Sequence, residues 1–139
     1  MKFYTFDSCA LIAVIFKSQG HETIKKILKK VEDDRAKIIM HKVNLLESIK
    51  VISKKRSPED AKMAYEYAIE SPIIFFDTID LPFCTEFAKI SQQFGTYFAD
   101  TFVATTNAIH THNKGTIVTS DKGFDKISET GYAKIEYFN

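Results

Sequence analysis

Short apolar runs that alternate with helix-like segments are the feature that most limits the fold of this chain. The runs are rich in β-branched and aromatic residues and are apolar at successive positions, as expected for strands with both faces covered. Strands that alternate with helices predict an α/β layered domain with a mainly parallel sheet. The predicted strands are Lys2–Phe6, Lys37–Met40, Ile73–Phe76, Thr116–Thr119 and Ala133–Tyr137.

The segments between these runs carry apolar residues at helical spacing. Helix boundaries are also visible: Ser57 is a predicted N-cap, Pro58 suits the first turn, and Ser71-Pro72 ends that helix near Glu70. The predicted helices are Ser8–Lys17, His21–Glu32, Lys42–Lys55, Pro58–Glu70, Leu81–Phe94 and Tyr97–His112.

The chain has the size and composition of a single globular domain that spans residues 1–139. At 139 residues, with 45% hydrophobic and 27% charged residues, it can bury a continuous core without disulfides or a structural metal. Its formal net charge is only +1, so any binding to a polyanion has to come from local basic patches. We find no internal repeat, linker or low-complexity tract.

Cysteine usage and hydropathy predict a cytoplasmic protein without a membrane segment. Cys9 and Cys84 are too few for a disulfide framework, and their apolar neighbours predict two buried free thiols in a reducing compartment. The longest apolar run, Ala10 to Phe16, is too short to cross a bilayer. Asp7 would lie in the apolar core of a signal peptide, so none is expected.

Four acidic residues accompany the ends of apolar runs. Asp7 follows the first predicted strand, Asp121 follows the fourth, Asp100 opens the run Thr101–Ala104, and Glu47 lies in the helix after the second strand. The carboxyl ends of parallel strands meet at one edge of a sheet, where ligands gather. Carboxylates that converge there repel one another, and a divalent cation with oxygen ligands resolves the repulsion. The pattern therefore predicts a metal-dependent enzyme that acts on phosphate.

Each acid also has a purely structural interpretation. Asp7 can cap the helix that begins at Ser8, and Asp121 can form a turn with its own backbone in Ser120–Gly123. Asp100 lies near the start of its helix, where a negative charge interacts favourably with the helix dipole. Only Glu47 lacks such an account, because Val43 and Val51 place it on an apolar stripe. Taken jointly, four such positions favour a common site.

The ordered motifs resemble the PIN domain, and among PIN domains the small VapC-type toxins of prokaryotic toxin–antitoxin pairs. The motifs, which cover essentially the whole chain, are Phe6-Asp7-Ser8, Leu46-Glu47, Phe98–Thr105 and Val118–Phe124. The resemblance implies a three-layer α/β/α domain with a five-stranded parallel sheet of order 3-2-1-4-5. It also implies a Mg²⁺- or Mn²⁺-dependent endoribonuclease, a homodimer, and a cognate antitoxin as partner.

The resemblance also implies the acids of a metal site, and the chemistry of phosphodiester hydrolysis suggests a role for each residue. Asp7, Glu47, Asp100 and Asp121 would be the acids of the metal site, with Asp7 and Asp100 closest to the ion. Glu47 would orient or deprotonate the attacking water. The supporting hydroxyl groups of Ser8 and Thr119 would hydrogen-bond to water at the site or to the phosphate.

Basic clusters offer a local surface for the RNA backbone despite the near-zero net charge. We single out Lys54, Lys55 and Arg56 as candidate RNA-binding residues at the end of a predicted helix. A solvated helix face explains such a cluster equally well.

Two other functions remain open from the sequence. One is a receiver-like signalling module, in which Asp77 would end a strand as phosphoacceptor and Thr119 would follow a later strand. The other is a non-catalytic binding module of the same α/β class. The receiver leaves Glu47 and Asp100 unexplained, and the intact set of acids argues against the binding module.

Overall fold

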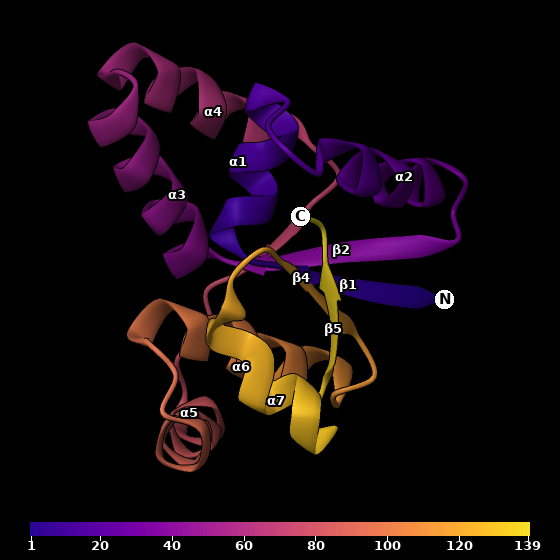
Figure 1. Cartoon of the computed structure of the whole chain (residues 1–139), viewed down its shortest axis with the longest axis vertical. Coiled ribbons are helices and arrows are strands. Elements are labelled where there is room, and N and C mark those ends of the chain that lie inside the picture. The colour runs from indigo at the N-terminus through magenta and orange to yellow at the C-terminus, as the bar shows by residue number, and fades with distance from the viewer.

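A five-stranded, all-parallel sheet with strand order β3-β2-β1-β4-β5 forms the centre of the molecule (Figure 1). The computed structural model describes residues 1–139. The strands are β1 (Lys2–Phe6), β2 (Ala36–His41), β3 (Ile74–Phe76), β4 (Thr116–Thr119) and β5 (Lys134–Tyr137). The sequence-based prediction of a parallel sheet of this order is confirmed.

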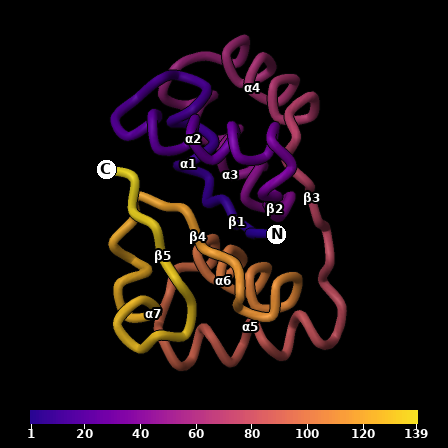
Figure 2. Tube along the Cα trace, turned by 90° about the vertical axis from the view of Figure 1, so that its right-hand side faces the viewer, coloured from indigo at the N-terminus to yellow at the C-terminus, as the bar shows by residue number.

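Helices cover both faces of the sheet. They are α1 (Ser8–Phe16), α2 (His21–Glu32), α3 (Lys42–Lys55), α4 (Pro58–Glu70), α5 (Leu81–Phe94), α6 (Phe98–Thr111) and α7 (Asp125–Thr130). Figures 1 and 2 both place α1–α4 on one side of the strands and α5–α7 on the other. The fold is therefore a three-layer α/β/α sandwich. None of the helices is both long and apolar enough to cross a membrane.

Each face of the sheet has its own hydrophobic core. On the side of α1 and α2, Tyr4 and Phe6 of β1 pack with Leu11 and Ile24. On the other side, Ile117 of β4 belongs to the cluster that contains residues of α5, α6 and α7. Because side chains alternate along a strand, each strand contributes to both layers, which explains why the strands are apolar at successive positions.

A buried polar contact fixes α6 against the sheet. The hydroxyl of Thr5 in β1 donates to Oδ1 of Asn107 at 2.8 Å, and both residues are fully buried. An unpaired polar group at this depth would be costly, so the contact favours one placement of α6 on β1. The two elements that carry Asp7 and Asp100 are thereby held in a defined relation.

The predicted element boundaries hold to within one or two residues, and two short elements are missing from the prediction. The Ser57 hydroxyl accepts from Asp60 N at 3.0 Å as the predicted N-cap of α4. A 3₁₀ turn at Lys122–Phe124 and helix α7 were not predicted. Both are short, and a helix of two turns around one buried residue, Ile127, leaves little periodicity in the sequence.

The prediction of two buried thiols is wrong. Both cysteines are free, but Cys84 is exposed and Cys9 is half-buried. Helix α5 packs mainly against α6 and so keeps an outer face in solvent, where Cys84 lies. Cys9 lies in the first turn of α1, beside Asp7.

Candidate active site

Asp7 is buried at the carboxyl end of β1 and is held by donors from three residues, Ser8, Cys9 and Thr119. Its Oδ1 accepts from the backbone N of Ser8 at 2.7 Å, which makes Asp7 the N-cap of α1. Its Oδ2 accepts from the Thr119 hydroxyl at 2.8 Å and from the Cys9 thiol at 3.4 Å. Burial raises the pKa of Asp7, and these hydrogen bonds oppose that rise. The predicted capping contact is therefore present, and the same carboxylate lies in the acidic cluster.

Asp100 lies in the first turn of α6 and is the least satisfied of the acids. It is 5% exposed, although the neighbouring Phe98 is 69% exposed, so this helix end is only partly buried. Its Oδ2 is buried and has no hydrogen-bond partner. Burial, followed by the charges of Asp7 and Asp121, raises the pKa of Asp100 to about 8. A buried carboxylate without a partner is unfavourable, which indicates that a cation belongs here.

Asp121 follows β4 and is the most exposed of the three aspartates. Its Oδ1 accepts from Gly123 N at 2.8 Å, and its own N donates to the Thr119 hydroxyl at 3.0 Å. The predicted turn is therefore present. The turn aims the carboxylate toward Asp7 and Asp100.

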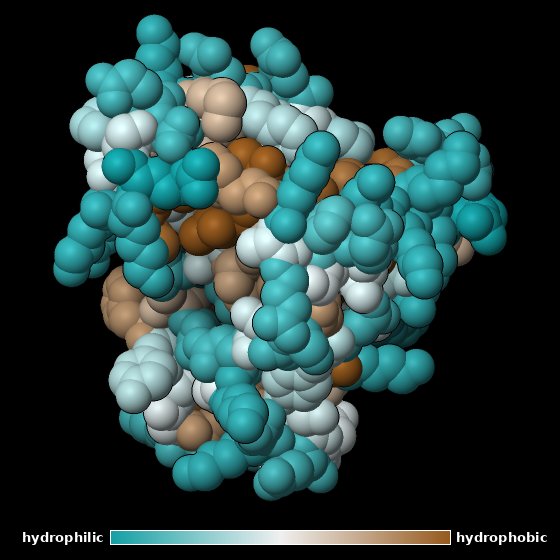
Figure 3. Space-filling model, turned by 45° about the horizontal axis from the view of Figure 1, so that its top comes forward, coloured by the Kyte–Doolittle hydropathy of each residue, from teal (hydrophilic) through white to brown (hydrophobic).

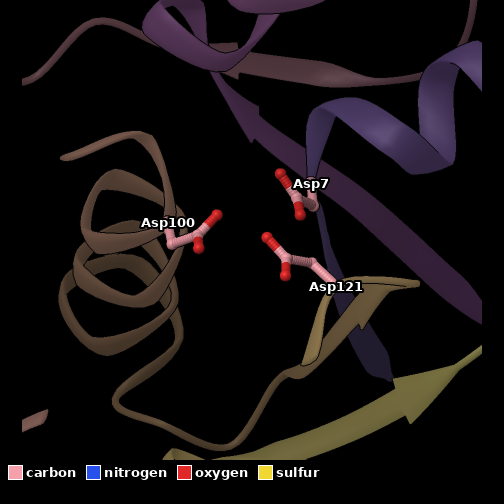
Figure 4. Close-up of side chains that lie close together, drawn as sticks. All are labelled: Asp7, Asp100 and Asp121. Atoms are coloured by element: carbon pink, nitrogen blue, oxygen red, sulfur yellow. The ribbon is translucent and has the colours of Figure 1, made fainter. Parts of the chain in front are cut away.

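The three aspartates converge from three separate segments (Figure 4). Carboxylate oxygens of Asp7, Asp100 and Asp121 all lie within 4.8 Å of one another. No lysine or arginine forms an ion pair with any of them. Three acidic oxygen ligands with an unpaired buried oxygen suit a hard divalent cation such as Mg²⁺ or Mn²⁺.

Gly123 keeps the space between two of these carboxylates open. A Cβ at this position would lie 2.7 Å from Oδ2 of Asp100 and 3.2 Å from Oδ1 of Asp121. Any larger residue would push both oxygens apart. The residues present thus leave room for an ion in direct contact with Asp100 and Asp121.

Replacing Gly123 with alanine should weaken metal binding without unfolding the protein. The added methyl group displaces two ligand oxygens, and a disturbance next to metal ligands typically costs about 10–100-fold in affinity. Calorimetric titration with Mn²⁺ measures the effect. Lys122→Ala, an exposed change in the same turn, is the control. Unchanged Mn²⁺ affinity in Gly123→Ala would place the ion elsewhere.

Glu47 lies near the three aspartates but outside their cluster. It is half-buried on α3, and its charge adds to the causes that raise the pKa of Asp7 and of Asp100. It lines a pocket of about 470 Å³ with Ser8, Cys9 and Lys55, among others. The prediction that four acids share one edge is thus met by three close aspartates and a more distant glutamate.

The supporting residues act mainly on Asp7. Thr119 is fully buried, and its hydroxyl bridges Asp7 and the backbone of Asp121. Ser8 holds Asp7 through its backbone N, while its hydroxyl lies 3.4 Å from the same oxygen. Cys9 and Gly123 were not among the predicted site residues. Only their positions, directly beside Asp7 and Asp121, pointed to a role.

The three basic residues at the end of α3, Lys54, Lys55 and Arg56, differ in their contacts. Arg56 pairs with Asp60 at 3.0 Å and lies 4.0 Å over the ring of Phe16. Lys55 lines the same pocket as Glu47, whereas Lys54 is exposed and does not. Lys55 is therefore the member of this run that shares a pocket with Glu47.

The structure excludes the receiver-like alternative. A receiver has strand order 2-1-3-4-5, whereas β3 lies at the sheet edge here. Asp77, the required phosphoacceptor, is exposed, pairs weakly with Lys42 at 3.9 Å and is no part of the acidic cluster.

Comparison with solved structures finds close likeness in fold at low sequence identity. VapBC2 from Rickettsia felis, bound to a promoter DNA fragment, has a TM-score of 0.70 and 16% identity, with 99% of each chain covered. DNA-bound VapBC from Salmonella typhimurium has a TM-score of 0.70 and 15% identity over the whole of both chains. VapBC-1 from nontypeable Haemophilus influenzae has a TM-score of 0.66 and 15% identity, with 98% of each chain covered.

The family comparison covers almost the entire chain. No curated protein matches the sequence. The PIN domain family model, however, matches residues 4–130, which include all four acids, β1 from Tyr4 onward, and all of β2, β3 and β4. The chain therefore belongs to the PIN domain family.

Proposed function

We propose that this protein is a divalent-metal-dependent endoribonuclease. The observation that carries the proposal is the cluster of Asp7, Asp100 and Asp121, which no protein cation neutralises. PIN domains are nucleases, so the cluster lies in a fold used for phosphodiester cleavage. RNA as the substrate and Mg²⁺ or Mn²⁺ as the ion are the specific parts of the proposal.

Asp7, Asp100 and Asp121 would hold the ion. A bound Mg²⁺ or Mn²⁺ neutralises charge on the phosphate and lowers the pKa of water. Asp7 enters with its orientation already set by Thr119 and Ser8, so little reorganisation is needed on binding. The unpaired Oδ2 of Asp100 gains the partner that the protein does not supply.

Glu47 and Lys55 would act on the substrate side of the cluster. Both line the pocket that also contains Ser8 and Ser120, the chain neighbours of Asp7 and Asp121, so an RNA strand in this pocket would lie beside the acidic cluster. Glu47 would orient the attacking water or accept its proton. The ammonium group of Lys55 would contact a backbone phosphate, with Lys54 and Arg56 further along the same helix end. Attack of water on phosphorus, with cleavage of the bond to the 3′ oxygen and protonation of that leaving oxygen, would leave a 5′-phosphate and a 3′-hydroxyl.

Cleavage of RNA in the presence and absence of a chelator tests the function. We expect the purified protein to cut single-stranded RNA with Mg²⁺ or Mn²⁺, to stop in excess EDTA, and to recover when the ion is restored. Products should accept ligation at their 5′-phosphates without prior kinase treatment. Cleavage that persists in excess EDTA, or products with cyclic phosphates, would contradict the proposal.

We further propose that the protein is the toxin of a toxin–antitoxin pair, in the manner of VapC. The structures it resembles are VapBC complexes, two of them bound to DNA. Figure 3 shows apolar side chains between hydrophilic rims on the side that carries α1–α4. The exposed apolar residues of these helices include Leu46 on α3 and Met63 and Ile69 on α4. An antitoxin segment that covers this face would block the pocket beside Glu47.

A neighbouring reading frame for a small DNA-binding protein tests the toxin proposal. Co-expression should yield a stable complex in which RNA cleavage is inhibited.

A homodimer is also expected, because Leu81 and Phe98 expose apolar surface on the α5–α6 side, at 79% and 69% exposure. Sedimentation equilibrium should give twice the 15.9 kDa chain mass.

A further inference from the structure

The amino ends of the strands, at the end of the sheet opposite the acidic cluster, carry a row of cations. Lys2 begins β1, Arg35 immediately precedes β2, Lys114 precedes β4, and Lys134 begins β5. Because the strands are parallel, their amino ends meet at one edge, where the N-terminus lies in Figure 1. The strand order β2-β1-β4-β5 places these four positions in sequence along that edge.

These cations line one surface pocket, which we call the basic pocket. Its volume is about 690 Å³, and no carboxylate is among its lining residues. Its charged and titratable members are the N-terminus of Met1, Lys2, Arg35, His110, His112, Lys114 and Lys134.

The charges of the basic pocket are poorly neutralised by the protein. Lys2, Lys114 and Lys134 form no ion pair, and Arg35 meets only Asp33, at 3.7 Å on an exposed surface. Helix α6 ends nearby at Thr111, but a helix C-terminus offers only about half a negative charge. With a net charge of +1 for the whole chain, this local excess is not a consequence of composition. A polyanionic ligand would offset it.

The size of the row favours a chain of phosphates over a single anion. Adjacent strands are about 4.8 Å apart, so four strand starts span roughly 14 Å, which exceeds one phosphate group. The amino and carboxyl ends of the sheet are separated by strands of four to six residues, or about 13–20 Å. An RNA of moderate length that places its scissile bond at the acidic edge can therefore reach the basic edge.

We propose that the basic pocket binds the phosphodiester backbone of the RNA substrate at a position remote from the cut. The inference rests on the proposed endoribonuclease function for the identity of the ligand. The pocket supplies affinity and selects longer RNAs, and it contributes nothing to the bond-breaking step. Cleavage would thus take place at the carboxyl ends of the strands, and the additional RNA binding at their amino ends.

Two double variants, each of which removes two positive charges, test whether the basic pocket binds RNA. Lys114→Gln/Lys134→Gln removes two cations of the pocket, and Lys26→Gln/Lys62→Gln removes two exposed, unpaired lysines elsewhere. Both pairs are made in an Asp100→Asn background, so that the RNA is not cut during the measurement. Thermal unfolding of each variant verifies that it is folded. The probes are a long single-stranded RNA labelled at one end, a hexanucleotide, and a duplex DNA.

The pocket variant should bind the long RNA at least about 10-fold more weakly at low salt. The slope of the logarithm of the binding constant against the logarithm of the salt concentration should decrease in magnitude by about 1.4, the value expected for the loss of two phosphate contacts to a single strand. The hexanucleotide should bind equally to both variants. Equal loss in both variants for the long RNA would overturn the proposal, as would a loss confined to duplex DNA. Failure of the parent protein to cut RNA, with pocket-dependent binding retained, would overturn the proposed function alone.

Discussion

Replacing Asp100 with asparagine is expected to abolish RNA cleavage and to stabilise the metal-free protein at pH 8. Asparagine cannot supply the anionic oxygen that the ion needs, so metal affinity and turnover should each fall roughly 100-fold or more. The same change removes a buried carboxylate whose Oδ2 has no partner. That carboxylate costs on the order of 1–3 kcal/mol in the metal-free state. The melting temperature should therefore rise by several degrees.

The stabilisation by Asp100→Asn should depend on pH in a defined direction. The pKa of Asp100 is raised from 3.8 to about 8 by burial and by the charges of Asp7 and Asp121. Between these values the folded protein keeps a proton that the unfolded chain releases, so the free energy of unfolding of the parent falls as the pH rises. Asparagine has no such proton. Its advantage should be largest at pH 8 and should shrink toward pH 4.

Glu66→Gln is the matched control for charge. Glu66 is exposed on α4 and forms no ion pair, so its loss should change neither activity nor stability. Urea unfolding of parent, Asp100→Asn and Glu66→Gln at pH 5 and pH 8 in excess EDTA gives the comparison. A destabilised Asp100→Asn variant would show that this acid is needed for the fold itself.

Replacing Glu47 with glutamine should reduce turnover far more than metal affinity. Glu47 lies outside the cluster of three aspartates but borders the same site, a position suited to acting on water. Loss of a general base lowers the rate by about 100- to 10,000-fold. Mn²⁺ affinity should fall less than in Asp100→Asn, because three carboxylate ligands remain.

Single-turnover cleavage and Mn²⁺ calorimetry on the same preparations separate the two effects. Glu66→Gln again controls for the lost charge. If Glu47→Gln cleaves at the parent rate, Glu47 has no role in the chemistry. If it loses Mn²⁺ binding as fully as Asp100→Asn does, Glu47 is a ligand and the assignment to water is wrong.

Most of the fold was predictable because its signals are local. Short apolar runs predicted every strand, and apolar residues at helical spacing predicted six of the seven helices. The N-cap at Ser57 was visible as a short motif. Strand order came from family resemblance, since pairing is set by contacts distant in sequence. Helix α7 escaped because it buries only Ile127. Cys84 was misjudged because apolar neighbours in sequence do not reveal which helix face stays in solvent.

The candidate site was predictable in its residues but not in its geometry. Asp7, Asp100 and Asp121 were placed by strand ends and motif order, and the structure brings them together. That Glu47 stands apart depends on the packing of α3, which the sequence does not specify. The bridging role of Thr119 and the clearance left by Gly123 arise from contacts across the sheet edge and within a turn. Such contacts become evident only in three dimensions.

The location of a bound ion tests the central claim most directly. Crystals grown with Mn²⁺ should show one strong anomalous peak in direct coordination distance of Asp7, Asp100 and Asp121, and crystals of Asp100→Asn should lack it. A peak at another position, such as His110 and His112, with none between the three aspartates, would contradict the assignment of this cluster as the metal centre.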